Sequence, residues 1–363
     1  MGTLFDYLDW RGDLSFSEVP LNEVDSLIFT QLSYIAFDGI ISNAIDVKPI
    51  SLRDAVRQYL KRHKGQAAYL GKIVPSAILS LAAKAAKSTR YANVKMLAYT
   101  NHVDRKTQTQ FSAVTFLPKN SPAYVAYRGT DDTLVGWKED FNMSFMQPVP
   151  AQTEAVAYLE RVAPYLSDRF FVGGHSKGGN LAVYAAVKCS PELQERIISV
   201  YNNDGPGFDR AFIEGVDYQN LRGKIRTIVP ESSVVGMLLE HEESYDVIKS
   251  HATGLMQHDG CSWEVLGGKF IYLDAITNES RLIDSTLRAW LDSMSMQERE
   301  KVVDSVYEVL VATNAKTLTD LTADKVKLVK AWGNLDPKVK SIVLKCIGIF
   351  FKESRTNKAG KKK

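Results

Sequence analysis

The stretch of sequence that decides the fold is Phe170-Phe171-Val172-Gly173-Gly174-His175-Ser176-Lys177-Gly178-Gly179. An apolar run leads into a glycine-rich turn, and the small residues from Gly178 to Lys188 continue with the period of a helix. A strand, a very tight turn and a helix are therefore expected to follow one another here.

The turn contains a serine between two glycines. Gly174, His175, Ser176, Lys177 and Gly178 fit the pattern G-x-S-x-G, which indicates a nucleophile elbow when a strand precedes it and a helix follows. The serine must adopt a strained backbone conformation, and a Cβ at 174 or 178 would collide with the neighbouring strand or helix. The free N–H groups of the helix then stabilise negative charge beside the hydroxyl. The alternative is a glycine-rich turn with an idle serine.

Further strands and helices are expected on both sides of this motif. Short apolar runs bounded by Asn, Pro and Gly predict strands, and longer runs predict helices. The strands lie at 94–99, 110–117, 123–127, 169–172, 197–201, 225–229, 245–248, 263–266 and 270–273, with helices at 134–145, 154–166 and 178–188. Strands that alternate with helices predict an α/β fold, with a mainly parallel sheet and helices on both faces.

Helical patterns dominate both ends of the chain. We expect an N-terminal helical segment over residues 1–90 packed on the core, and the α/β core over 91–276. A C-terminal helical layer follows over 277–351, and a disordered basic tail over 352–363.

The charge of the chain excludes one class of partner. Its 363 residues hold 45 Lys plus Arg and 42 Asp plus Glu, a net charge of +3. Residues 352–363 contain six basic residues and one acid, which leaves the rest of the chain slightly acidic. No protein-wide basic field is present, so a nucleic-acid partner is not expected. The lysines of the tail predict a solvated end, with a weak membrane-surface contact as the alternative.

The cysteines and the apolar segments bear on metal, cofactor and location. Cys189, Cys261 and Cys346 form neither a disulfide framework nor a C-x-x-C pair, so no metal and no other cofactor is expected. Residues 1–10 carry acids where a signal peptide has basic residues, and no apolar run is long enough for a membrane span. A cytoplasmic protein is expected, whereas the oligomeric state stays open.

A serine nucleophile needs a histidine base, and in this fold class the order along the chain is serine, acid, histidine. His258 follows the elbow, in a loop just before the strand expected near Trp263, and is the predicted base. His251 is the second candidate for the base. His241 lies among glutamates on a predicted solvated helix face.

Two acids compete to orient the base. Asp204 ends the strand after the elbow helix, and Glu231 ends the strand after that. Both follow carboxyl ends of strands, where such sites assemble. Asp204 is favoured because Gly205-Pro206-Gly207 fixes its turn, with Glu231 as the alternative acid.

The oxyanion hole needs two donors. One is the backbone N–H of Lys177, after the nucleophile. The second is expected from Thr130, which follows the strand at 123–127 and offers a backbone N–H and a hydroxyl. The alternative is an ordinary turn in which Thr130 or Asp132 caps the next helix.

These motifs together resemble a known superfamily. The segments from Tyr127 to Thr130, from Gly174 to Ala182, and Gln257-His258 are similar to the class 3 (fungal-type) lipases of the α/β-hydrolase superfamily. A closer likeness, over about residues 1–275, is to the bacterial Mbeg-like family of α/β-hydrolase proteins. It includes the segments from Asp6 to Asp13, from Asn202 to Phe208, and from Ser233 to Leu238.

The lipase resemblance implies Ser176 as nucleophile, His258 as base, and Thr130 with Lys177 as oxyanion donors. Two departures are present. The lipase acid belongs to the segment matching Pro230 to Gly236, which here contains Glu231 and no Asp. Lys177 replaces an apolar residue, and a lysine at a helix N-terminus opposes the helix dipole. Lys177 is therefore expected either to meet an anionic group of the substrate or to point outward.

The sequence as a whole predicts a serine hydrolase that cleaves a carboxylic ester or thioester, of a small molecule or a lipid, through an acyl-enzyme. The alternative is a catalytically silent hydrolase fold that serves as a binding or scaffold protein.

Overall fold

The fold is described from a computed structural model that covers residues 2–63, 74–166 and 168–311, with scattered positions between 316 and 344. The predicted basic tail, Cys346 and most of the predicted helical layer beyond 311 lie outside the described residues.

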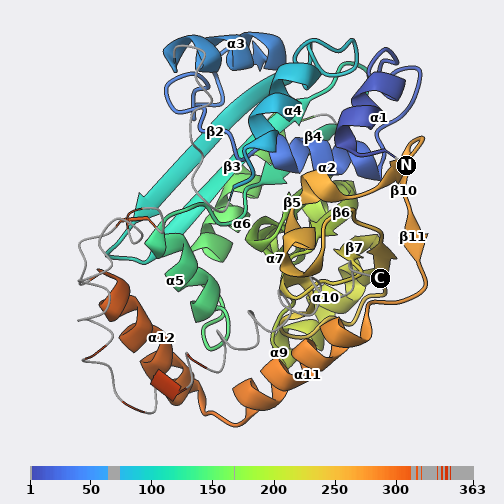
Figure 1. Cartoon of the computed structure of the whole chain (residues 1–363). Helices are drawn as coiled ribbons and strands as arrows, with labels where there is room; N and C mark the ends of the chain where they lie inside the picture. Colours follow the sequence, from blue (N-terminus) through green and yellow to red (C-terminus); the bar gives the residue numbers. More distant parts are fainter. Residues whose placement is uncertain are drawn as a thin grey trace.

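A nine-stranded sheet runs through the molecule in the order β1-β2-β3-β4-β5-β6-β7-β8-β11 (Figure 1). The neighbours from β4 to β8 are parallel, and the pairs at the two ends of the sheet are antiparallel. The strands are β1 (Ile50–Ser51), β2 (Lys95–Asp104), β3 (Thr109–Leu117), β4 (Ala123–Tyr127), β5 (Phe170–His175), β6 (Ile197–Asn203), β7 (Ile225–Pro230), β8 (Tyr245–Ile248) and β11 (Tyr272–Leu273).

Helices cover both faces of this sheet. The longer ones are α1 (Leu4–Arg11), α2 (Glu23–Leu32), α3 (Leu52–Arg62), α4 (Ala77–Ala85), α5 (Leu134–Asn142), α6 (Pro150–Val162), α7 (Lys177–Lys188), α11 (Asn278–Asp292) and α12 (Met296–Val311). Short ones are α8 (Pro191–Arg196), α9 (Arg210–Ile213) and α10 (Val216–Leu221). The predicted fold class, an α/β fold with helices on both faces, is confirmed.

Alternation along the strands divides the core into two layers. In β4, Val125 packs with α6 and α7 on one face, whereas Tyr124 and Ala126 pack with α1, α2 and α4 on the other. The N-terminal helices, which include the blue group in Figure 1, thus cover one face together with the segment from Cys261 to Phe270. All ten residues of α2 are buried, because the helix lies between this face and the rest of its layer.

One buried carboxylate ties the N-terminal layer together. Asp25 on α2 accepts hydrogen bonds from the Tyr7 hydroxyl, at 2.9 Å, and from two guanidinium nitrogens of Arg90, at 2.8 and 2.5 Å. The Tyr91 hydroxyl donates to the same carboxylate. Because Asp25 and Arg90 are both fully buried, removing either partner would leave an uncompensated charge in the core.

Two expectations on element boundaries were wrong. The predicted strands at 263–266 and 270–273 are split: β9 (Val265–Leu266) and β10 (Lys269–Phe270) form a separate hairpin, and β11 alone joins the sheet. Gly267, at φ +62°, makes the tight turn of that hairpin. The helix predicted at 154–166 begins earlier, at Pro150, since proline suits a first helical turn and the Gln152 side chain accepts the Val149 N–H at 2.9 Å.

The two C-terminal helices lie near the carboxyl ends of the parallel strands. Helix α12 packs on α5, and α11 lies against the loop after β7 (Figure 1). The Arg288 side chain on α11 pairs with Asp284 of the same helix and with Glu240 of that loop. Among the described residues, no helix has the length and apolar character needed to cross a membrane.

Candidate active site

Ser176 occupies a strained turn between β5 and α7. Its backbone has φ 58° and ψ −136°, a conformation that non-glycine residues rarely adopt. A Cβ on Gly174 would lie 2.0 Å from the carbonyl carbon of Gly178, and a Cβ on Gly178 would lie 2.2 Å from the Tyr127 oxygen. Both flanking positions therefore require glycine, and the serine is held at the carboxyl edge of the sheet.

Asp204 and His258 lie together at the same edge. Asp204 Oδ2 is 2.6 Å from His258 Nδ1, although 54 residues separate them in the sequence. Asp204 is fully buried, whereas 27% of the His258 side chain is exposed. A carboxylate accepts hydrogen bonds, so Nδ1 carries the hydrogen and Nε2 remains the basic nitrogen.

The structure separates the two candidate acids. Asp204 Oδ1 accepts from Ser233 Oγ at 2.5 Å and from the Gly236 N–H at 3.2 Å, so its carboxylate is fixed from both sides. Within the described part of the chain, the Glu231 carboxylate has no hydrogen bond or ion pair. The segment that carries the acid in lipases thus supplies two donors to Asp204 instead.

His175 holds the loop that carries His258. Its Nε2 donates to the His258 carbonyl oxygen at 2.7 Å, so Nδ1 is unprotonated and accepts from the Tyr34 hydroxyl at 3.1 Å. The two imidazole rings lie 4.7 Å apart, centre to centre. Burial, reinforced by His258, lowers the pKa of His175 to about 3. His175 therefore stays neutral and keeps this bonding pattern at physiological pH.

The other two histidines after the elbow lie outside this arrangement. His251 is exposed, and its backbone N–H donates to Ser262. His241 was predicted to lie on a helix, but it lies in the loop before β8. Its side chain is 6% exposed, and its Nδ1 is 3.2 Å from Glu243 Oε1. The expectation of a solvated helix face was wrong, because the loop folds against α10, where Tyr218 donates to the same glutamate.

Backbone contacts hold Ser176 next to the segment that carries Asp204. Its N–H donates to the Asn203 carbonyl at 2.9 Å, and a Cβ on Gly205 would lie 2.5 Å from the Ser176 carbonyl oxygen. Among the described residues, its hydroxyl has no protein hydrogen-bond partner. Serine–histidine hydrogen bonds are often long before substrate binds, and form as the reacting complex assembles.

Two backbone N–H groups near Ser176 have no acceptor among the described residues. Those of Thr130 and Lys177 donate to no protein group in the described ranges, and Gly129 approaches so closely that a Cβ there would lie 3.0 Å from Ser176 Cβ. The Thr130 hydroxyl donates to Asp140 Oδ2 at 2.5 Å. The hydroxyl hydrogen is therefore used by Asp140, so of the two donors expected from Thr130 only the backbone N–H has no acceptor in the described ranges.

The side chain of Lys177 does not follow the prediction. It was expected to meet an anionic substrate group or to point outward, yet it is 1% exposed and its Nζ lies 2.9 Å from Glu139 Oε2. The expectation was wrong because it considered only the helix dipole, whereas α5 supplies a buried carboxylate. Burial raises the pKa of the neighbouring Asp140 to about 6, although Lys177 acts in the opposite direction.

Sequence reasoning missed several side chains that hold the site in place. Ser233, Tyr34 and Glu139 carry no local motif, because each acts on a residue distant in the sequence. Only Ser233 had a signal in the sequence, and it was indirect. The segment from Pro230 to Gly236, where lipases carry the acid, contains no Asp but contains Ser233.

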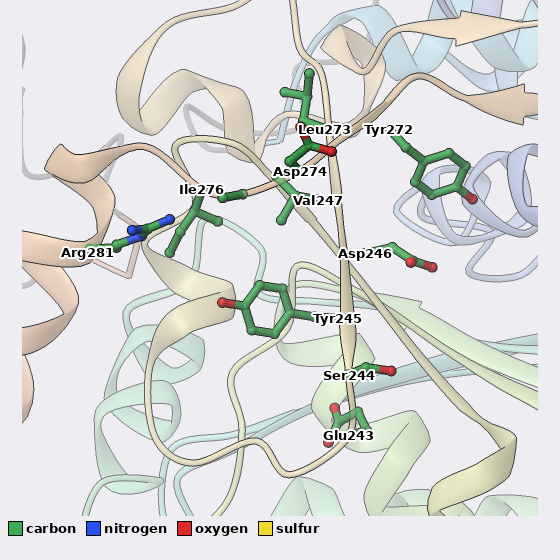
Figure 2. A pocket seen from close by; sticks show the side chains of 11 residues that line it. Glu243, Ser244, Tyr245, Asp246, Val247, Tyr272, Leu273, Asp274, Ile276 and Arg281 are labelled. Atoms are coloured by element: carbon green, nitrogen blue, oxygen red, sulfur yellow. The ribbon is translucent and has the colours of Figure 1, made fainter.

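In the part of the chain that the structure describes, no cluster of three or more His, Cys, Asp or Glu side chains is arranged to bind a metal. Two surface cavities, of about 500 and 360 Å³, lie elsewhere. The larger is lined by residues of β8, β11 and α11, including Tyr245, Tyr272 and Arg281 (Figure 2). Neither is lined by Ser176, Asp204 or His258.

The chain has an α/β-hydrolase fold, defined by a mixed central sheet with parallel strands from β4 to β8, a strained serine between a strand and its helix, and an acid–histidine pair after later strands. The chain belongs to the Mbeg1-like family, which its sequence matches over residues 85–308. The match includes α11 and most of α12, so it ends later than the resemblance seen in the sequence.

Solved structures similar to the chain are lipases at low identity. A fungal lipase–inhibitor complex is 12% identical, with a TM-score of 0.38 over 63% of this chain and 78% of that one. The Rhizomucor miehei lipase propeptide complex is 18% identical, with a TM-score of 0.33 over 44% and 57%. M37 lipase is 15% identical, with a TM-score of 0.34 over 58% and 68%. No curated protein matches the chain.

Proposed function

We propose that the protein is a serine hydrolase that cleaves a carboxylic ester or thioester through an acyl-enzyme intermediate. The observation that carries the proposal is the hydrogen bond of 2.6 Å between Asp204 and His258, beside a serine in a strained elbow turn. A buried acid that orients a partly exposed imidazole is what a serine nucleophile requires.

In the first half-reaction, His258 Nε2 accepts the proton of the Ser176 hydroxyl as the oxygen attacks the substrate carbonyl carbon. Asp204 holds the imidazole tautomer and stabilises the imidazolium that forms. The negative charge on the carbonyl oxygen is bound by the N–H groups of Thr130 and Lys177. Collapse of the tetrahedral intermediate breaks the bond to the alcohol or thiol, which leaves with the proton from His258.

In the second half-reaction, water replaces the alcohol or thiol. His258 takes a proton from water, the resulting hydroxide attacks the acyl-serine, and the same two N–H groups bind the oxyanion. When the intermediate collapses, His258 returns the proton to Ser176 Oγ, and the carboxylic acid is released.

A fluorophosphonate probe tests this proposal, because it phosphonylates activated serines. We expect labelling of the wild-type chain at Ser176 and none of Ser176→Ala. Hydrolysis of p-nitrophenyl esters and acyl thioesters by the two proteins would then be compared. If the folded wild type is neither labelled nor active where a control esterase is, the enzyme proposal fails and the binding or scaffold alternative gains support.

A further inference from the structure

The residue directly after Ser176 has a charged side chain that is buried. Lys177 Nζ donates to the Gln110 carbonyl oxygen at 2.8 Å, to Gln110 Oε1 at 2.6 Å and to Glu139 Oε2 at 2.9 Å. Asp140 Oδ1 lies 3.8 Å away. The ammonium group has three hydrogens, and the three short contacts use all of them.

Stability does not explain this arrangement. Burying a Lys–Glu pair costs about as much in desolvation as the attraction returns, and packed apolar residues of similar size are often as stable or more so. A long apolar side chain at 177 would fill the same space. We therefore look for the role of the charged pair in the positions of the groups that it contacts, and not in stability.

The groups that Lys177 holds belong to the other side of the oxyanion hole. Glu139 also accepts the N–H groups of Gln110, at 3.0 Å, and Ala151, at 2.8 Å, so α5 is fixed against β3 and the start of α6. The next residue of α5, Asp140, binds the Thr130 hydroxyl at 2.5 Å. An unbroken set of contacts therefore runs from Lys177 through α5 to Thr130.

We propose that Lys177 is a positioning residue that holds the Thr130 N–H opposite its own N–H, so that one side chain sets the spacing of the oxyanion hole. The inference rests on the proposed function. It gives the Lys177 backbone a direct role in charge stabilisation, and the Lys177 side chain an indirect role through Glu139, Asp140 and Thr130.

The test replaces Lys177 and measures the oxyanion hole directly. In Lys177→Met, we expect kcat for an ester to fall about 100-fold, the cost of a misplacement of about 1 Å, with KM nearly unchanged. The affinity of a trifluoromethyl ketone, whose adduct with Ser176 carries an oxyanion, should fall in parallel with kcat/KM. A merely structural role would instead reduce the fraction of titratable enzyme and leave the inhibitor affinity of that fraction unchanged.

Two further variants protect the test against misfolding. Lys177→Met combined with Glu139→Gln removes both buried charges and should show the same loss of inhibitor affinity. Lys138→Met removes a second buried lysine of the same region, which pairs with Asp304 on α12 and has no contact with Thr130. Its kcat and inhibitor affinity should stay within about twofold of wild type.

The outcomes separate this inference from the proposed function. If either Lys177 variant keeps wild-type kcat and inhibitor affinity while Ser176→Ala is inactive, the positioning role is wrong and the hydrolase proposal stands. If the wild type neither hydrolyses esters nor binds the ketone, the proposed function fails first.

Discussion

The two sides of the site are built from different kinds of interaction. On one side, Asp204 is surrounded by neutral donors, Ser233 Oγ and the Gly236 N–H, and meets His258. In the described part of the chain, no Lys or Arg pairs with Asp204. On the other side, Lys177 and Glu139 form a buried ion pair beside the proposed oxyanion donors.

The difference follows from what each side must do. A carboxylate that stabilises a transient imidazolium would lose that ability beside a permanent cation, so neutral donors must hold it in place. The proposed oxyanion donors are backbone amides, which carry no net charge, and the Lys177–Glu139 pair can fix them without adding net charge to that side of the site. Four substitutions test this contrast, from the largest expected effect to the smallest.

The largest effect is expected from Asp204, the proposed triad acid. Asp204→Asn should lower kcat for p-nitrophenyl esters by about 10⁴-fold, because the amide stabilises the wrong tautomer of His258. Glu231→Gln is the matched control and should stay within about twofold. Equal losses in both variants, or none in either, would show that the acid is misassigned.

A smaller effect is expected from a neutral donor to that acid. Ser233→Ala removes one hydrogen bond to a carboxylate, and kcat should fall about tenfold at similar KM, since such a bond contributes roughly 1.5 kcal/mol or more. Ser232→Ala, one residue away and without a contact to Asp204, is the control. Steady-state kinetics on both variants, with thermal melts to check folding, measures the difference.

On the charged side, activity and stability should change in opposite directions. In Asp140→Asn the weaker acceptor for the Thr130 hydroxyl should lower kcat about fivefold. The pKa of Asp140, about 6, is raised above its ordinary value of 3.8, so the folded state holds the proton more tightly than the unfolded state. The free energy of unfolding therefore falls as pH rises from about 4 to about 6, and stays lower above that range.

Asparagine cannot ionise and avoids this loss. Asp140→Asn should thus melt roughly 1–3 °C above wild type near pH 8, with no gain near pH 4. Thermal melts at the two pH values measure the difference. The groups that face Asp140 are Thr130, Lys177, Glu139 and Asp131, and all stay unchanged in the comparison. A gain that is equal at both pH values would contradict the ionisation argument.

The smallest effect is expected from α11. The Ser280 hydroxyl donates to the Ser233 carbonyl oxygen, which links this C-terminal helix to the loop that holds Asp204. Ser280→Ala should lower kcat by about twofold to fivefold, the range for a neutral hydrogen bond two steps from the reacting groups. Ser285→Ala, exposed on the same helix, should leave kcat unchanged; an equal loss there would make the effect unspecific.

Sequence reasoning could predict the parts of the candidate site that local geometry dictates. The elbow was predictable because Gly174 and Gly178 have a direct steric reason, and His258 because the chain order of such sites is restricted. The preference for Asp204 over Glu231 agrees with the geometry, yet sequence left it open, because both acids follow carboxyl ends of neighbouring strands.

What sequence could not supply are contacts between distant segments. The direction of the Lys177 side chain depends on Glu139, 38 residues earlier. The Thr130 hydroxyl donates to Asp140 only because of the way in which α5 packs. The hairpin of β9 and β10 was missed for a similar reason: a short apolar run fits either sheet, and only tertiary packing decides between them.

Helix α2 has a consequence for how the protein is made. All ten of its residues are buried, and it packs on β4, β5 and β6. The ribosome synthesises α2 near the start of this sequence but does not complete β6, which ends at Asn203, until much later. At typical rates of synthesis, roughly 10–35 s pass between completion of α2 and completion of β6. During that interval the apolar side chains of α2 lack the strands that bury them in the folded protein, and exposed apolar surface of this kind makes incomplete chains prone to aggregation.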